Sequence, residues 1–260
     1  MTKYKCERTY NDSNIDRSCK RGRYWKMIGR FLAMTALGSL LLTGCGAKVD
    51  VPDMSSMGTV NVVSREEGSG TKTEFDNLVG TDATGTNTVA DSTDKVISEV
   101  ASDKNAIGYI AYSAENNSGV KVLDVDGVVP DAASIEKDKY PLCRDYILVY
   151  NGELSAVAKD FMAYVKSAGQ AVVADYCVPV KKSETFLSDK SGGMVEIHGS
   201  TSAAPIVSKL AEEYMKINPS AKVVVTESDS TQGLNDVLQG RCDLGMASRS
   251  LQSYESELLT

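Results

Sequence analysis

From residue 58 onward, short apolar runs alternate with segments whose apolar residues recur every three or four positions. Runs rich in β-branched and aromatic residues predict strands, and the 3.6-residue periodicity predicts helices. The alternation of the two is typical of an α/β fold. We expect strands at 59–64, 106–112, 120–125, 144–150, 194–199, 221–227 and 242–248, and helices at 71–80, 91–103, 153–169, 202–219 and 231–240.

Several of these boundaries carry their own start and stop signals. Asp91 or Ser92 can cap the start of the second helix through a side-chain oxygen. Gly80 and Pro219 are typical residues at the end of a helix. The Asp-Gly pair at 126–127 predicts a tight turn.

The periodic pattern is interrupted once, at 181–193, where Lys, Ser and Gly accumulate. This composition predicts a linker, which divides the chain into a segment 58–180 and a segment 194–260. The second segment runs strand, helix, strand, helix, strand. Such an order favours parallel strands joined by right-handed crossovers.

Composition and charge limit the classes of partner. With 260 residues, 42% hydrophobic and 24% charged, the chain is globular and long enough for one large domain or two small lobes. The formal charge is −7 overall but +6 over residues 1–44, so the remainder carries −13. Nucleic acids recruit basic surfaces, and we therefore exclude them as a partner. An anion bound here must be held by dipoles and hydrogen bonds.

The N-terminal segment reads as a targeting signal. Residues 1–44 combine basic residues, an apolar stretch from Met27 onward that is short for a membrane span, and small residues before Cys45. "LTGC" resembles the lipobox of bacterial lipoproteins, which implies a signal peptide, lipidation of Cys45 and a tether at 45–57. A plain signal anchor is the alternative. The fold prediction excludes residues 1–26.

The six cysteines do not form a metal-binding pattern. There is no C-x-x-C, and the single histidine, His198, has no thiol near it in sequence, so neither a metal nor a cofactor is expected. Cys143 and Cys177 can pair in an exported protein, but buried thiols are the more common state.

Hydroxyl side chains gather where predicted strands give way to helices, which is where open α/β sheets bind ligands. Free amides at a helix N-terminus favour anions. The first two such junctions carry Gly199 to Ser202 and Arg65 to Thr71, and Arg65 can grip an oxyanion with two parallel hydrogen bonds. A third carries Ser228, Ser230 and Thr231.

Two nucleotide-binding loops are excluded by spacing. A P-loop needs Gly-Lys-Ser/Thr in series, whereas Thr71 separates Gly70 from Lys72. A dinucleotide loop needs G-x-G-x-x-G, which "GSGTKT" lacks.

Four stretches together resemble the phosphate-binding proteins of ABC transporters: "SREEGSGTKTEF", "AIGYIAYSAENNSGVKVLDVDG", "GSTSAAPIVSKLAEEYMKINP" and "CDLGMASR". The resemblance implies a two-lobed fold like the type II periplasmic binding proteins. It implies a non-enzymatic, lipid-anchored protein on the outer face of the cell membrane that captures inorganic phosphate for permease subunits. The implied phosphate ligands are Arg65, Ser69, Gly70, Thr71, Thr201, Ser202, Ser230 and Asp243.

The order of the two halves differs from the usual one in this family. The half with "GSTS" usually opens the chain, whereas here it follows the linker, which resembles a circular permutation. Relatives also continue beyond the "CDLGMASR" region with a segment that completes one lobe. We therefore expect a C-terminal truncation, with one lobe incomplete.

Asp243 is expected to discriminate between anions. A carboxylate repels a bound anion unless the ligand supplies a proton, which hydrogen phosphate can do and sulfate at neutral pH cannot. A residue of a strand-end turn is the plainer interpretation of Asp243. Glu66 and Glu67 are expected to form a solvated flank; the alternative is that one of them orients Arg65.

Two other functions stay open. A phosphatase or serine-type hydrolase would use Ser200 or Ser202 with His198 as the base. A surface lipoprotein that senses phosphate without transporting it would use the same fold.

Overall fold

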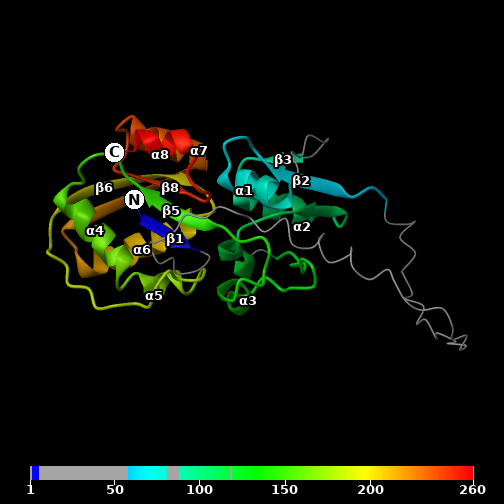
Figure 1. The fold of residues 1–260 in the computed structure, drawn as a ribbon, viewed down its shortest axis with the longest axis horizontal. Helices are drawn as coiled ribbons and strands as arrows, with labels where there is room; N and C mark the ends of the chain where they lie inside the picture. The colour runs from blue at the N-terminus through cyan, green and yellow to red at the C-terminus, as the bar shows by residue number, and fades with distance from the viewer. Residues whose placement is uncertain (1, 6–57, 81–87, 118, 260) are drawn as a thin grey trace, which may run out of the picture. The chain divides into compact units, whose positions relative to one another are not determined.

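The computed structural model describes residues 2–5, 58–80, 88–117 and 119–259 (Figure 1). Strands and helices alternate along most of this range. The strands are β1 (Thr2–Lys5), β2 (Asn61–Arg65), β3 (Thr88–Ala90), β4 (Ala106–Gly108), β5 (Asp145–Val149), β6 (Gly193–Ser200), β7 (Ala221–Ser228) and β8 (Leu244–Ala247). The helices are α1 (Gly70–Val79), α2 (Thr93–Ser102), the 3-10 helix η1 (Tyr112–Asn117), α3 (Ala132–Glu136), α4 (Ala156–Lys166), α5 (Gln170–Val173), α6 (Ala204–Ile217), α7 (Ser230–Leu238) and α8 (Ser253–Leu258).

The described strands form two sheets. The larger has the order β1-β5-β8-β6-β7, and the smaller has the order β3-β2-β4. In the larger sheet β6 is parallel to β7 and to β8, as the sequence predicted, whereas β5 is antiparallel to β8. In the smaller sheet β2 is parallel to both neighbours. The mixed α/β fold of the sequence analysis is confirmed.

Helices cover both faces of the larger sheet. Leu148 of β5 belongs to the cluster with α4 and α6, whereas its neighbours Ile147 and Val149 pack with α7 on the opposite face. This alternation is what a strand covered on both sides requires.

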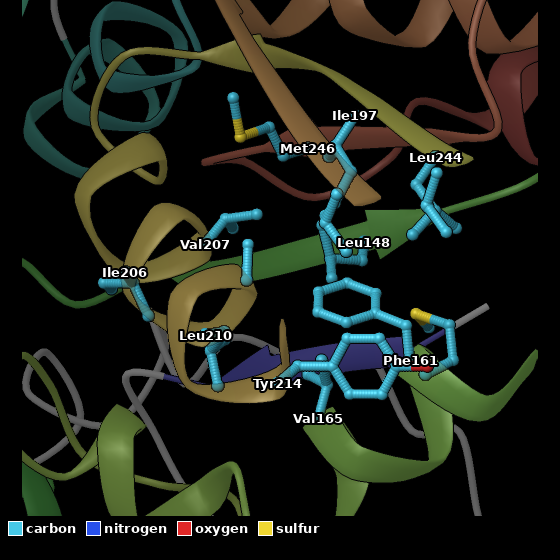
Figure 2. Close-up of a cluster of buried hydrophobic side chains, with 14 of the residues drawn as sticks. Leu148, Phe161, Val165, Ile197, Ile206, Val207, Leu210, Tyr214, Leu244 and Met246 are labelled. Atoms are coloured by element: carbon cyan, nitrogen blue, oxygen red, sulfur yellow. The ribbon is translucent and has the colours of Figure 1, made fainter. Parts of the chain in front are cut away.

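The main core lies between the larger sheet and α4 and α6. Figure 2 shows Phe161 of α4 and Tyr214 of α6 beside Leu148 of β5, and the two rings meet edge to face with centroids 5.3 Å apart. Both aromatic side chains are fully buried. Burial of aromatic and aliphatic side chains of this size contributes roughly 1.5–3 kcal/mol each, so this cluster is the main source of stability.

The predicted caps and turns are largely confirmed. Ser92 caps α2 by accepting from the Lys95 amide at 3.2 Å, and Gly80 ends α1 in the left-handed conformation. The Asp126-Gly127 pair forms a turn with both residues at positive φ. α6 ends at Ile217, just before Asn218-Pro219.

Two strand predictions were wrong: one segment forms no strand, and the other forms a shorter strand than expected. Residues 120–125 form no strand, since Val125 makes only an isolated bridge to Val128 across the turn. The strand predicted for 106–112 ends at Gly108. β-branched residues fit a strand only where a partner strand is present, and residues 120–125 have no partner strand among the described residues.

The predicted segments 58–180 and 194–260 do not coincide with the two sheets. β5, α4 and α5 lie in the first segment but pack with β6, β7 and β8 of the second. Pairing such as Leu148 with Met246 joins residues about a hundred positions apart, and local periodicity carries no information about it.

Within the linker 181–193, the C-terminal part is held in place. The buried Asp160 carboxylate accepts from the Ser188 hydroxyl at 2.6 Å and from the Asp189 amide at 3.0 Å. The Tyr214 hydroxyl donates to the same carboxylate at 2.8 Å. The linker is therefore tied to both α4 and α6.

The N-terminal predictions fall mostly outside the described residues, including Cys45, the tether and residues 6–44. Within the segment left out of the fold prediction, Thr2–Lys5 forms β1 beside β5. No helix of the described residues has the length and apolarity to cross a membrane.

Candidate anion-binding site

Arg65 stands at the end of β2 and is only 3% exposed. Its Nη2 donates to the Thr201 hydroxyl at 3.2 Å and its Nη1 to the Thr93 hydroxyl at 3.4 Å. Nε and Nη2 also donate to the two oxygens of Glu66, both at 2.7 Å. For Glu66 the solvated flank was wrong and the alternative is confirmed, because its carboxylate pairs with the arginine.

Tyr109 fixes the backbone of the arginine. Its hydroxyl accepts from the Arg65 amide at 3.1 Å and lies 3.0 Å from the Ser64 hydroxyl. The Tyr109 ring stacks on Phe75 of α1 at a centroid distance of 4.1 Å. β2 and α1 are thus joined through one aromatic pair.

The loop after Arg65 turns sharply into α1. Gly68 has φ 88°, and a Cβ there would lie 2.7 Å from an Asp229 oxygen, so both the turn and the close approach require glycine. Ser69 accepts from the Lys72 amide and so caps α1. The first amides of α1 therefore point toward the loop, as at other anion-binding helix N-termini.

Hydroxyls from the two sheets meet directly beside Arg65. Ser202, which follows β6, lies with its Oγ 2.8 Å from the Thr71 Oγ1 of α1 and 3.1 Å from the Thr93 Oγ1 of α2. Ser202 is 2% exposed and Thr71 is 6% exposed. Residues about 130 positions apart in sequence therefore share one buried cluster.

Three serines form the floor of this cluster. The Ser200 hydroxyl donates to the Ser248 Oγ at 2.9 Å, and the Ser248 amide donates to the Ser230 Oγ at 3.1 Å. A Cβ on Gly70 would lie 2.4 Å from the Ser230 Oγ, so glycine is needed for this packing. All three serines are buried.

The cluster offers many hydrogen-bond donors and one ion pair, between Arg65 and Glu66. α1, α6 and α7 begin at this cluster, and their N-terminal amides carry partial positive charge. The hydroxyls of Thr71, Thr93, Thr201 and Ser202 can donate or accept. Arg65 supplies a cation whose charge Glu66 offsets. Chemically, such a set of donors is suited to a desolvated anion held by hydrogen bonds.

Seven of the eight predicted ligands lie in or beside this cluster. Arg65, Thr71, Thr201 and Ser202 are joined by hydrogen bonds, Ser69 and Gly70 begin α1 beside them, and Ser230 begins α7. Whether these residues bind phosphate remains a prediction.

Asp243 is the exception, and the prediction that it lies with the other ligands was wrong. Its carboxylate accepts from the Glu196 amide at 2.8 Å, next to the amino end of β8. The hydroxyl cluster lies at the carboxyl end of β8, four residues on, which is about 13 Å along a strand. The sequence placed Asp243 at a strand end but did not show which end.

The hydrolase alternative does not have its required geometry. The Nδ1 of His198 lies 2.8 Å from the Oδ2 of Asp236, and no hydrogen bond within the described part of the chain joins His198 to Ser200 or Ser202. Cys242 lies nearby, and burial raises the pKa of its thiol to about 11, which keeps it protonated. Neither side chain is placed as a base or a nucleophile.

The described residues hold no group of three or more His, Cys, Asp or Glu side chains suited to a metal ion. Cys177 is buried in the main core, as expected for an apolar thiol.

Sequence reasoning missed Ser248 and Thr93 as members of the cluster. Ser248 belongs to the motif "CDLGMASR", but only Asp243 of that motif was predicted as a ligand. Thr93 follows an N-cap serine and looked like an ordinary first residue of a helix. Its hydroxyl lies 3.1 Å from the Ser202 hydroxyl, a contact between residues more than a hundred positions apart that no local pattern predicts.

Comparison with known proteins gives consistent matches. Residues 50–168 and 184–259 match the PBP superfamily domain. The phosphate-binding protein PstS 2 of Streptococcus pneumoniae serotype 4 is 34% identical over 242 residues, covering 88% of this chain and 83% of that protein. The protein of the same name in Streptococcus agalactiae serotype V is 35% identical over 245 residues, covering 89% and 82%.

A solved structure agrees with these matches. The crystal structure of a phosphate-binding protein of a phosphate ABC transporter from Streptococcus pneumoniae TIGR4 superposes with a TM-score of 0.60 at 35% identity, covering 78% of this chain and 84% of that one. These relatives are binding proteins, in agreement with the expectation that the chain is not an enzyme. The family match over most of the chain and the identity to PstS 2 show that this chain belongs to the PBP superfamily.

Proposed function

We propose that this chain binds inorganic phosphate in the cluster around Arg65 and supplies it to an ABC importer on the outer side of the cell membrane. One observation carries the proposal. Arg65 from the smaller sheet and Thr201 from the larger sheet meet at 3.2 Å, in a chain whose relatives are named phosphate-binding proteins.

The donors suffice for a desolvated anion. Charge-assisted hydrogen bonds contribute roughly 1.5–3 kcal/mol each. Several of them together support micromolar affinity, about −8 kcal/mol, after desolvation and ordering of the site are subtracted. An overall acidic surface does not oppose this, because the stabilisation is local.

Isothermal titration of the full chain with phosphate tests the proposal. Replacing Arg65→Gln removes the cation and leaves the Glu66 carboxylate without its partner, and we expect roughly 100-fold weaker binding. Arg241→Gln is the matched control, since Arg241 is half exposed and lies just before β8, at the amino end of that strand. Equal affinities for the two variants would contradict the proposal. Arsenate, which matches phosphate in size and protonation, is expected to compete.

We further propose a lipid anchor at Cys45, supported by the lipobox-like "LTGC". Metabolic labelling with an alkyne analogue of palmitate should mark the wild-type chain. Cys45→Ala should lose the label and appear in the medium, whereas Cys143→Ala should keep both label and membrane fraction. A labelled Cys45→Ala protein would refute the anchor.

The exchanged order of the two halves is also a proposal. It is supported by the position of "GSTS" after the linker at 181–193. A rearranged gene in which 194–260 precedes 58–180 should still yield phosphate binding if the halves are equivalent units of one fold. An insoluble or inactive product would argue that the present order is required.

A further inference from the structure

A second buried arginine lies next to residues of the proposed site without belonging to it. Arg249 follows β8 directly after Ser248 and is 1% exposed. Its Nη1 and Nη2 donate to the two oxygens of Glu255 in α8 at 2.7 and 2.6 Å. A buried ion pair of this kind adds little net stability, because desolvation of both charges offsets their attraction.

Arg249 also reaches the first turn of α7. Its Nη2 donates to the Thr231 hydroxyl at 3.2 Å. That hydroxyl donates in turn to the Gly68 carbonyl at 3.1 Å, and the Thr231 amide donates to the same carbonyl at 3.2 Å. Because the hydroxyl accepts from one side, its own hydrogen is directed to the other.

The Gly68 carbonyl connects Thr231 to the loop between β2 and α1. Gly68 belongs to the part of the chain that carries the smaller sheet, whereas Thr231 belongs to the part that carries the larger one. Its carbonyl immediately precedes Ser69 and Gly70, where α1 begins. The position of the α1 amides relative to α7 therefore depends on the carbonyl that Thr231 holds.

We infer that Thr231, oriented by Arg249, is a positioning residue of the proposed anion site and acts on the Gly68 carbonyl. The inference rests on the proposed function. Arg249 does not itself serve as an anion ligand, because its Nη groups are engaged by Glu255, Thr231 and the Ser250 carbonyl. It supplies orientation, while Arg65 supplies the cation.

Thr231 offers a test that leaves the buried ion pair in place. Thr231→Val removes the hydroxyl with little change in shape, and Thr231→Ser restores it. We expect phosphate affinity, measured by titration calorimetry, to fall about tenfold in the valine variant and to stay within about twofold of wild type in the serine variant. Thr226→Val, at an exposed position of β7, is the control and should bind like wild type.

A ligand-free measurement separates this inference from the proposed function. Amide hydrogen exchange at Gly70 and Thr71 should be faster in Thr231→Val than in wild type and unchanged in Thr231→Ser. Unchanged exchange, or wild-type phosphate affinity in the valine variant, overturns the positioning role. If wild type fails to bind phosphate, the proposed function fails, and the exchange rates alone still decide whether Thr231 positions the loop.

Discussion

The two sheets differ sharply in how they are stabilised. Around the larger sheet, a continuous cluster of buried side chains includes Phe161, Tyr214 and Leu148. Around the smaller sheet, the buried cluster among the described residues consists of Val63, Ala90 and Val96. The larger sheet therefore has its own core, and the smaller one has little apolar burial to hold it.

Polar contacts take the place of the missing core. The opposite face of the smaller sheet exposes Val62, Val89 and Ile107 at 39–64%. Its elements are joined to those of the larger sheet by hydrogen bonds, such as Thr71 to Ser202 and the Ser250 amide to Glu74 at 2.8 Å. The same groups that would hold an anion thus also hold the smaller sheet, as is common where binding elements come from the less stable part of a protein.

The largest expected effect is in the main core. Phe161→Ala should lower the free energy of unfolding by about 3–5 kcal/mol, because it leaves a cavity against Tyr214 and α6. Urea denaturation followed by circular dichroism measures it. A loss below about 1 kcal/mol would mean that the larger sheet does not depend on this cluster.

The next effect concerns the buried carboxylate of Asp160. Although burial raises its pKa, the hydrogen bonds from Ser188, the Asp189 amide and Tyr214 outweigh this and hold the pKa below its usual value of 3.8. A lowered folded pKa gives stability that is present above pH 3.8 and is lost as pH falls through the folded value.

Asp160→Asn should therefore cost about 1–3 kcal/mol at pH 7, where the wild-type carboxylate accepts three hydrogen bonds. The difference from wild type should shrink as pH falls below 3.8. Thermal unfolding from pH 7 to pH 2.5 measures both. A difference that is constant over this range would show that ionisation of Asp160 does not contribute.

A smaller global effect is expected in the smaller sheet. Val96→Ala should remove about 1–2 kcal/mol of apolar burial, mostly by local opening of β2, β3 and α2. Hydrogen exchange should speed up at Val63 and Ala90 and stay unchanged at Leu148. Equal acceleration in both sheets would show that they unfold as one unit and do not differ in stability.

The smallest effect is expected at Asp243. Asp243→Asn should leave the phosphate-to-sulfate preference unchanged in competition calorimetry, because the carboxylate bonds the Glu196 amide about 13 Å from the hydroxyl cluster. Stability should change by less than about 0.5 kcal/mol, since an asparagine oxygen can accept the same bond. A smaller ratio of phosphate affinity to sulfate affinity in the variant would show that Asp243 takes part in anion selection.

Local signals predicted local structure well. Caps at Ser92 and Gly80 and the turn at Asp126 have their causes within a few residues, so they were predictable. The antiparallel placement of β5 was not, because it depends on β8, about a hundred residues later. The segment 120–125 was overpredicted, since apolar content alone does not supply a partner strand.

The same distinction between local and long-range signals applies to the candidate site. Strand-to-helix junctions indicated Arg65, Thr71 and Ser202 because hydroxyls and free amides coincide there in sequence. Thr93 and Ser248 were missed because each is linked to the cluster only by a contact with a distant segment: Thr93 contacts Ser202, and the Ser248 amide donates to Ser230.

The packing of Gly70 onto the serine floor has a practical consequence for biosensor engineering. A Cβ built on Gly70 would lie 2.4 Å from the Ser230 Oγ and 2.8 Å from the Ser248 Oγ, so these two hydroxyls limit the space next to the glycine. If the proposed anion site is correct, serine-to-alanine exchanges at these two positions would widen it for a bulkier oxyanion one hydroxyl at a time and would leave the glycine turn and its helix in place.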